Sequence, residues 1–330
     1  MLLNTTHSAI LFLVFNRPDT TAQVFERIRQ AQPPRLYIAA DGPRPDKANE
    51  AENCRLTRAV VERVDWPCQV ITLFRVTNLG CKEAVSSAID WFFSHEQEGI
   101  ILEDDCLPAP IFFGYCDALL ERYRHDTRIR HICGCNFQFG QKRGDASYYF
   151  SRLSHVWGWA SWRRAWRDYD KNLSAHNADE LGEAMAHIFD DPIIVDRWSH
   201  VARELKANKI NTWDYQLTFT NFLHNGLCII PNENLISNIG FGASATHTTD
   251  HGARYASLPL GHIDNLSHPA HFIPHRQADL FTLNEEFQVE RIRAQHKRRS
   301  SKLRQLRHRI KRWLAAHGGP ARWQKAGVDG

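Results

Sequence analysis

The sequence has no apolar run long enough to cross a bilayer, and it has no repeats and no low-complexity tracts. It contains neither a Walker loop nor a GxGxxG motif, so the common glycine-rich phosphate loops are excluded. The eight cysteines lack zinc-finger spacing, and we expect them to be reduced thiols of a cytosolic protein. The apolar stretch 9–15 has no basic region before it, so it predicts a first strand and not a signal peptide.

The composition is that of an ordinary globular protein, but the charge is unevenly distributed. The chain has 330 residues, 43% hydrophobic and 24% charged, which is compatible with one large domain or two fused domains. Residues 1–290 carry 28 Lys and Arg against 36 Asp and Glu, whereas residues 291–330 carry 13 Lys and Arg against one acid. A mildly acidic body is therefore followed by a strongly basic tail.

The tail has the pattern of an interfacial helix. Five apolar side chains fall on one helical stripe with basic residues around it: Leu303, Leu306, Ile310, Trp313 and Leu314. Each basic residue near an anionic leaflet contributes roughly 1 kcal/mol to membrane binding. We expect 291–330 to bind an anionic membrane surface, with a helix docked on its own domain as the alternative. Nucleic acid is an unlikely partner, because the body has no matching basic face.

Strands and helices are predicted to alternate through the first 125 residues, which is the pattern of an α/β protein with a mostly parallel sheet. The predicted strands are 9–15, 35–40, 69–75 and 100–102, and the predicted helices are 20–31, 50–64, 81–94 and 109–124. Ligands of such sheets bind at the carboxyl ends of the strands. The polar side chains at those ends should therefore line one crevice: Asn16, Arg17, Asp41, Asn78 and the acids 103–105.

The acids Glu103, Asp104 and Asp105 follow a buried strand directly. Three like charges at one strand end repel each other, and a bound divalent cation is a common reason for a fold to keep them together. Asp105 is the first candidate ligand, for Mn²⁺ or Mg²⁺, together with phosphate oxygens of a substrate. The alternative is a solvated acidic turn that binds no metal.

Two further segments contain candidate binding residues. In the tryptophan-rich segment 156–166, Trp157 and Trp159 flank Gly158 and could stack on the faces of sugars, whereas Trp162 and Trp166 have the spacing of core residues. His155 could bond a substrate or could be structural. The glycine-containing segment 238–248 predicts a loop that closes over substrate, in which His247 could reach a diphosphate or complete a metal shell.

These residues resemble a known family. The segment 10–41, with its strand-Asn-Arg-helix-strand-Asp-Gly order, and 99–115, with Glu-Asp-Asp and Pro-x-Phe-Phe, look like the nucleotide-binding half of inverting GT-A glycosyltransferases. The N-acetylglucosaminyltransferase type I enzymes and similar bacterial, sometimes hemolysin-labelled, sugar-nucleotide transferases are the nearest such families. The resemblance extends through 157–159, 213–214 and 231–248, so it covers roughly residues 8–250.

The resemblance implies specific roles. Arg17 and Asp41 would contact the uracil and ribose, Asp105 would bind Mn²⁺, and Glu103 and Asp104 would contact the ribose and donor sugar. The family's general base follows an aromatic residue near the acceptor site, and Trp213-Asp214 matches it. Here Asp214 precedes Tyr-Gln, where the family has a second acid. The alternative role for Asp214 is a carboxylate bonded to a neighbouring tryptophan or backbone N–H.

The expected protein is thus an inverting, metal-dependent GT-A enzyme that transfers a sugar from a nucleotide sugar, first of all a UDP-sugar, to a hydroxyl of a glycan or glycolipid. It would lie at the cytoplasmic face of the membrane, where a bacterial polysaccharide acceptor would fit. The expected parts are a nucleotide-binding half (1–110), an acceptor-binding half (111–250), an irregular connection (251–290) and the basic tail (291–330). The alternatives are a nucleotidyltransferase on a similar sheet and a non-catalytic, membrane-associated protein that binds nucleotide or sugar.

Overall fold

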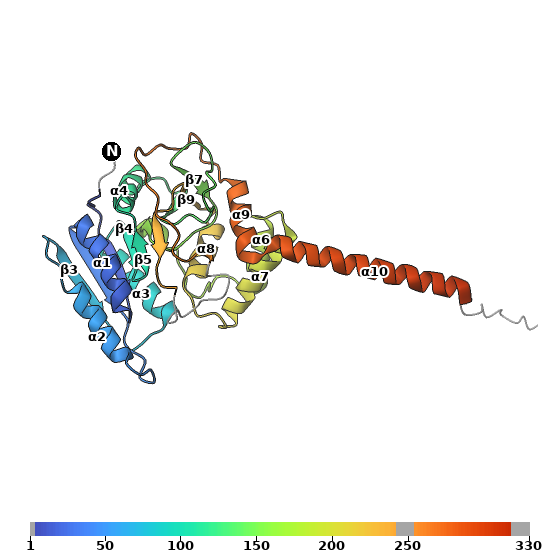
Figure 1. Ribbon diagram of the computed structural model, residues 1–330, viewed down its shortest axis with the longest axis horizontal. Coiled ribbons are helices and arrows are strands. Elements are labelled where there is room, and N and C mark those ends of the chain that lie inside the picture. The colour runs from blue at the N-terminus through green and yellow to red at the C-terminus, as the bar shows by residue number, and fades with distance from the viewer. Residues whose placement is uncertain (1–3, 242–253, 318–330) are drawn as a thin grey trace, which may run out of the picture.

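The computed structural model describes residues 4–241 and 254–317, and its centre is a mixed sheet of eight strands in the order β3-β2-β1-β4-β8-β6-β9-β7 (Figure 1). The strands are β1 (Ile10–Val14), β2 (Arg35–Ala40), β3 (Gln69–Phe74), β4 (Glu98–Glu103), β6 (Ile129–Cys133), β7 (Tyr148–Ser151), β8 (Trp159–Trp162) and β9 (Leu227–Pro231). Only β7 and β8 run opposite to their neighbours. The expected α/β fold class with a mostly parallel sheet is therefore confirmed.

The four strands that precede the candidate site residues are mutually parallel. Strand β1 lies between β2 and β4, and β2 pairs with β3, with Leu13 of β1 opposite Glu103 of β4. The carboxyl ends of all four strands thus meet at one edge of the sheet. Neighbouring strands are about 4.8 Å apart, so the ends of β3 and β4, three steps apart, are separated by roughly 14 Å.

Helices cover both faces of the sheet because the parallel strands are apolar on both sides. Alternate residues Ile10, Phe12 and Val14 of β1 pack in a core shared with α1 (Pro18–Ala31), α2 (Glu50–Val61) and α4 (Phe112–Arg122). Leu11 and Leu13 pack on the other side, in a core shared with α3 (Cys81–His95), α5 (Arg163–Trp166) and α8 (Asp214–Leu223). The halves expected on either side of residue 110 therefore share one sheet and its cores.

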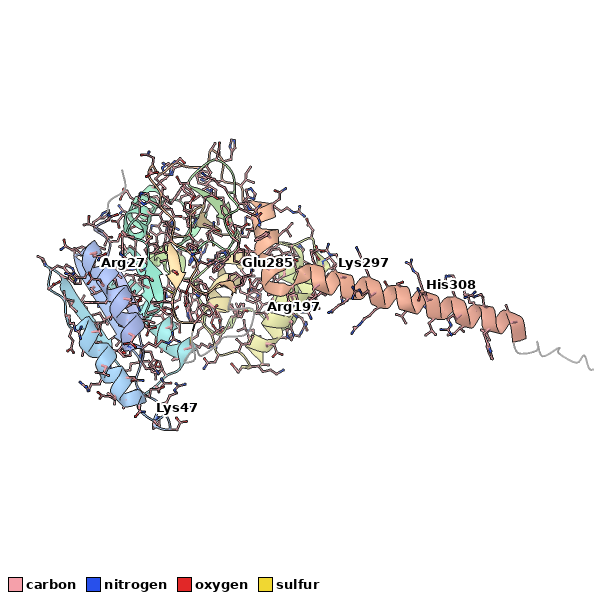
Figure 2. All side chains as sticks on the ribbon, in the orientation of Figure 1. Arg27, Lys47, Arg197, Glu285, Lys297 and His308 are labelled. Atoms are coloured by element: carbon pink, nitrogen blue, oxygen red, sulfur yellow. The ribbon has the colours of Figure 1, made fainter. Side chains whose placement is uncertain are left out.

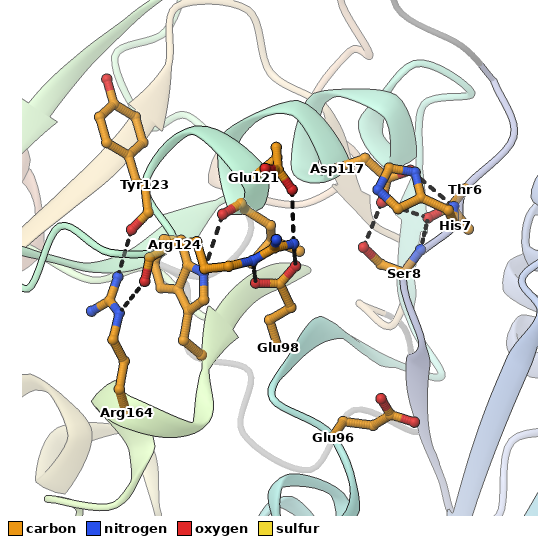
Figure 3. Close-up of polar contacts among 12 residues, drawn as sticks. Thr6, His7, Ser8, Glu96, Glu98, Asp117, Glu121, Tyr123, Arg124 and Arg164 are labelled. Carbon is orange, nitrogen blue, oxygen red and sulfur yellow. Dashed lines mark hydrogen bonds and ion pairs between the residues drawn. The ribbon is translucent and has the colours of Figure 1, made fainter.

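Polar contacts fix the start of the chain and the far end of α4 (Figure 3). The Asp117 carboxylate of α4 accepts hydrogen bonds from Thr6 Oγ1 at 2.8 Å, Ser8 Oγ at 2.5 Å and the His7 backbone N–H at 3.0 Å. Arg124 donates to both oxygens of Glu98, the first residue of β4. These contacts hold β1 and β4, the two central strands of the site, against the same helix.

Two smaller parts complete the body. Strand β5 (Cys106–Pro108) directly follows the acids and pairs with β10 (Ile236–Asn238), which brings residues 238–241 beside them. Helices α6 (Ala178–Ala186) and α7 (Pro192–Lys206) form a second core around Trp198, together with Phe219 and Phe287. Phe287 ends α9 (Arg276–Phe287), so the segment 251–290, expected to be irregular, contains a helix.

The basic tail is helical over residues 291–317, as expected, and residues 318–330 lie outside the described part. Helix α10 (Val289–His317) packs on α7 and α9 at its base, where Val289 is buried, and then projects from the body (Figure 1). Charged side chains surround the projecting part, from Lys297 near the body to beyond His308 (Figure 2). The stripe from Leu303 to Leu314 is 43–60% exposed. Among the described residues, no helix has the length and apolarity to cross a membrane.

Candidate functional site

A cavity of about 500 Å³ opens at the carboxyl ends of the four parallel strands. Seven of the predicted site residues line it, and they come from five separate segments of the chain: Arg17, Asp41, Asn78, Glu103, Asp104, Asp105 and Trp157. This convergence is the arrangement that the strand-end pattern predicts. Two other predicted residues, Asn16 and Gly158, lie near the cavity without lining it.

The acids lie against one guanidinium. Arg17 Nη1 lies 2.7 Å from Asp105 Oδ2 and 3.7 Å from Asp104 Oδ1, and Asp104 Oδ2 accepts a hydrogen bond from the Phe15 N–H at 3.1 Å. Burial and the charge of Asp105 raise the pKa of Asp104 to about 7. Burial and the charges of Asp105 and Asp104 likewise raise the pKa of Glu103. One cation therefore does not compensate the three acids.

The acids fit a divalent cation that is only partly held by protein. In the described part of the chain, no three His, Cys, Asp or Glu side chains are placed to surround a metal ion together. Mg²⁺ and similar cations usually take one or two carboxylates and complete their shell with phosphate oxygens and water. Asp105, with Asp104 beside it, offers that set, and the uncompensated charge favours a cation. His247 lies outside the described residues.

Asp41 organises the loop that forms another wall of the cavity. Its carboxylate accepts hydrogen bonds from the backbone N–H groups of Gly42, Leu79 and Gly80, at 2.9–3.2 Å. Asn78 Nδ2 donates to the Gly42 carbonyl at 2.8 Å. Asn16 points elsewhere, because its Nδ2 donates to Glu50 Oε1 at 2.9 Å. Asp41 and Asn78 thus shape the site, whereas Asn16 supports the neighbouring Arg44–Glu50 pair.

Arg75 is a cavity residue that the sequence analysis missed. It directly follows β3, and its guanidinium donates to Ser87 Oγ at 2.8 Å. In the part of the chain that the structure describes, no carboxylate forms an ion pair with Arg75, and burial lowers its pKa. Asp41 and Glu83 attract Arg75 without forming an ion pair, and such a half-buried cation is suited to a ligand that offers acceptor oxygens. The strand-end rule that singled out Asp41 also applies to Arg75.

Trp157 contributes to an aromatic wall. Its ring packs edge-to-face on Phe241 and Phe137, with ring centroids 5.7 and 5.1 Å apart, and Tyr255 lines the cavity beside Phe241. Gly158 has φ +59°, and a Cβ there would come within 2.4 Å of Ile236. A side chain at position 158 would therefore clash with Ile236.

Trp159 is buried in the core, which argues against its predicted acceptor-binding role. It is 1% exposed and stacks on Trp213 and His131, with ring centroids 5.9 and 4.8 Å apart. Trp159 is the first residue of β8, and its ring packs on the face of the sheet that α3 and α8 cover. Trp162 and Trp166 are core residues, as predicted, and His155 is buried as well.

Asp214 lies at the first turn of α8, where Thr212 Oγ1 donates to its Oδ1. Its charge acts on two other acids, Glu103 in the cavity and Glu286 in α9. Glu286 is an exposed residue, but desolvation of its carboxyl group and the charge of Asp214 raise its pKa to about 7. Glu286 lies near the end of a helix, 72 residues after Asp214 in the chain. No pattern in the sequence predicts that the two side chains interact.

Comparison with known proteins gives little guidance. No family model matches the chain, and no curated protein matches it. Among solved structures, it is similar to UDP-glucose pyrophosphorylase complexed with UDP-glucose, at 12% identity and a TM-score of 0.25. That match covers 46% of this chain and 64% of the other, less than two thirds of its length. At so low a similarity, the description of the fold depends on the strand order and register above.

Proposed function

We propose that this protein is a metal-dependent glycosyltransferase that transfers a sugar from a nucleotide sugar, first of all a UDP-sugar, to a hydroxyl group of a glycan or glycolipid. The observation that carries the proposal is the convergence of Arg17, Asp41, Asn78 and the acids 103–105 on one cavity at the carboxyl edge of the sheet. That convergence also agrees with the GT-A resemblance of the sequence.

The cavity has the length and the polarity that a nucleotide requires. Asp41 and Arg75 lie at the ends of β2 and β3, and the acids lie at the end of β4, roughly 14 Å from β3. A nucleoside diphosphate extended along this edge would place its base near Asp41 and Arg75. Its diphosphate would then lie near Arg17 and Asp105.

Asp105, with Asp104, would hold Mn²⁺ or Mg²⁺ at the diphosphate. When bound, such an ion stabilises the negative charge that develops on a departing nucleoside diphosphate. Arg17 adds a second positive charge at the same point, and its position between β1 and β4 is fixed by its ion pairs. The donor would thus be oriented with its sugar toward Trp157, Phe241 and Tyr255, whose rings could pack on the apolar face of a pyranose.

Asp214 is the proposed general base. An acceptor hydroxyl has a pKa far above 7, so a positioned carboxylate must take its proton as the new bond forms. Thr212 orients the Asp214 carboxylate, and Asp214 lies outside the residues that line the nucleotide cavity, as a group that approaches from the acceptor side would. Direct attack from that side inverts the anomeric centre.

We also propose that α10 binds an anionic membrane surface at the inner face of the cell membrane. Helix α10 contains eleven Lys and Arg residues and a single acid, Glu290, and its apolar stripe from Leu303 to Leu314 is exposed. Arg293 pairs with Asp191 and Ile292 is half-buried, so the base of the helix belongs to the body. Truncation after Ser300 should therefore release the protein from anionic liposomes and leave turnover of a soluble acceptor intact.

The transferase proposal is tested by incubating the purified full chain with a panel of nucleotide sugars and Mn²⁺, and by identifying the released product. Release of a nucleoside diphosphate that needs Mn²⁺ and an acceptor supports glycosyl transfer. Formation of pyrophosphate from a sugar phosphate and a nucleoside triphosphate would instead assign the protein as a nucleotidyltransferase. Binding of donor without any turnover would leave only a binding protein.

A further inference from the structure

A second cavity, of about 1000 Å³, lies at the foot of α10, between α10, α9 and the start of α7. None of the residues that line it belongs to the nucleotide cavity. The projecting helix leaves the body at this point (Figure 1). Any surface that α10 contacts therefore comes close to this cavity.

The floor of this cavity is apolar and partly open to water. Phe189 lines it from the segment before α7 and Ile193 from the first turn of α7, while Ile273 lines it from the segment before α9 and Leu280 from α9 itself. Ile273 is 70% exposed and Leu280 is 38% exposed. Exposed apolar side chains that gather in a cavity rimmed by polar residues are typical of a ligand-binding site.

The rim of the cavity carries more basic than acidic side chains: Arg152, Arg276, Arg293 and Lys297 against Asp190, Asp191 and Asp279. Arg293, His296, Lys297 and Ser300 have the i, i+3, i+4, i+7 spacing of one helix face and line one wall together. Arg293 is paired with Asp191, but Lys297 forms no ion pair with any described acid. Arg152, on the opposite wall, donates to the neutral Asn225 Oδ1 at 2.8 Å. Lys297 thus adds a positive charge that no ion pair compensates, and Arg152 adds another that Asp279 attracts without forming an ion pair.

We infer that this cavity binds a single anionic membrane lipid, with the acyl chains against Ile273 and Leu280 and the phosphate near Lys297 and Arg152. An apolar floor with a cationic rim is complementary to an anionic amphiphile. A second copy of the chain is disfavoured as the occupant, because each α10 has eleven basic residues and one acid and the copies would repel each other. The bilayer proposed to bind α10 supplies the lipid, and the inference does not depend on sugar transfer.

The test uses the full chain and a short-chain lipid below its micellar concentration, so that no bilayer is present. In calorimetry, dihexanoyl-phosphatidylglycerol should bind saturably. Dihexanoyl-phosphatidylcholine should bind with an affinity at least about tenfold lower. Lys297→Glu and Leu280→Asp should each weaken phosphatidylglycerol binding about tenfold or more. The matched controls are Arg63→Glu, with the same change of charge at an exposed site, and Leu56→Asp, because Leu56 is 39% exposed on helix α2. Both controls should bind the lipid as the unmodified chain does.

Three results would overturn the inference: no saturable binding by the unmodified chain, equal binding of the two lipids, or unchanged binding by Lys297→Glu and Leu280→Asp. Nucleotide binding, measured on the same proteins, shows whether the substituted chains are folded and should be unchanged. A chain that binds the lipid but no nucleotide sugar would contradict the proposed transferase and support the lipid site.

Discussion

The Arg17 guanidinium lies 2.7 Å from Asp105 Oδ2, and this contact joins the ends of the neighbouring parallel strands β1 and β4. Arg17 follows β1, whereas Asp105 follows β4, and the pairing of Leu13 with Glu103 brings the two chain segments together. Three acids and one guanidinium carry a formal charge of −2 when all are ionised. A divalent cation would neutralise that charge.

The pairing predicts effects of opposite sign for Arg17→Ala. Without the guanidinium the acids lose their positive neighbour, so Mn²⁺ alone should bind more tightly than to the unmodified chain. UDP should bind more weakly, by about 1–3 kcal/mol, because a charged hydrogen-bond donor is lost. Titration calorimetry with each ligand separately measures both effects.

Asp105→Asn is the companion prediction. It should abolish the increase in UDP affinity that Mn²⁺ causes, with little change in the free energy of unfolding, because one charge is removed from a repulsive group. Asp65→Asn is the matched control, since the Asp65 side chain is 61% exposed on the surface beside Arg29. Equal Mn²⁺ dependence in Asp105→Asn and the control would refute the metal assignment.

A third prediction concerns Arg75. Arg75→Gln should weaken binding of UDP by about 1–3 kcal/mol, because the cavity would lose a charged hydrogen-bond donor that forms no ion pair with any described acid. The loss should be the same with and without Mn²⁺, since β3 is roughly 14 Å from the acids. Arg63→Gln, on the surface, should bind UDP normally. A defect that vanished when Mn²⁺ was omitted would place Arg75 at the diphosphate instead.

The fourth prediction separates two candidate bases. Asp214→Asn should lower kcat by about 100-fold or more and leave the Kd of the donor nearly unchanged, because the lost interaction develops only as the acceptor proton moves. Glu286→Gln should have a much smaller effect on kcat. The opposite order would assign the base to Glu286, whose pKa of about 7 also suits proton transfer near neutral pH.

The sequence alone was sufficient to predict the strands and helices of the N-terminal half of the fold. The strand predicted at 35–40 has those bounds, and the other predicted strands and helices of that half differ at their ends by up to three residues. This worked because buried parallel strands are continuous apolar runs and because polar residues mark where they end. The seven predicted residues that line the cavity all follow from that rule or from the resemblance.

Side-chain partners and distant contacts could not be predicted in the same way. Trp157 and Trp159 are equally apolar, and only the turn at Gly158 and the pairing of β8 decide that Trp157 faces the cavity while Trp159 is buried. Helix α9 was missed because its apolar residues do not form one stripe: Asp279 and Thr282 are buried, whereas Leu280 is 38% exposed. Glu286 approaches Asp214 only through the packing of α9 on the second core, which no local pattern encodes.

The buried histidines give a final prediction, on stability. Burial lowers the pKa of His131 to about 4 and that of His155 to about 3, and His131 Nε2 lies 2.8 Å from the His155 carbonyl oxygen. In the unfolded chain these imidazoles have a pKa near 6.5. Above about pH 6.5 the two histidines therefore do not change the free energy of unfolding with pH. Below pH 6.5 the unfolded state binds protons that the folded state does not bind.

Each histidine should thus lower the free energy of unfolding by about 1.4 kcal/mol per pH unit as the pH falls from about 6.5 to about 4. Buried acids such as Asp279, whose pKa burial raises to about 6, act in the opposite direction, so the prediction is a difference between variants. His131→Gln, which removes one imidazole, should lose stability less steeply over this range in urea unfolding measured by fluorescence. His187→Gln, at an exposed position, should follow the unmodified chain. Parallel curves for His131→Gln and the unmodified chain would show that His131 is protonated in the folded protein.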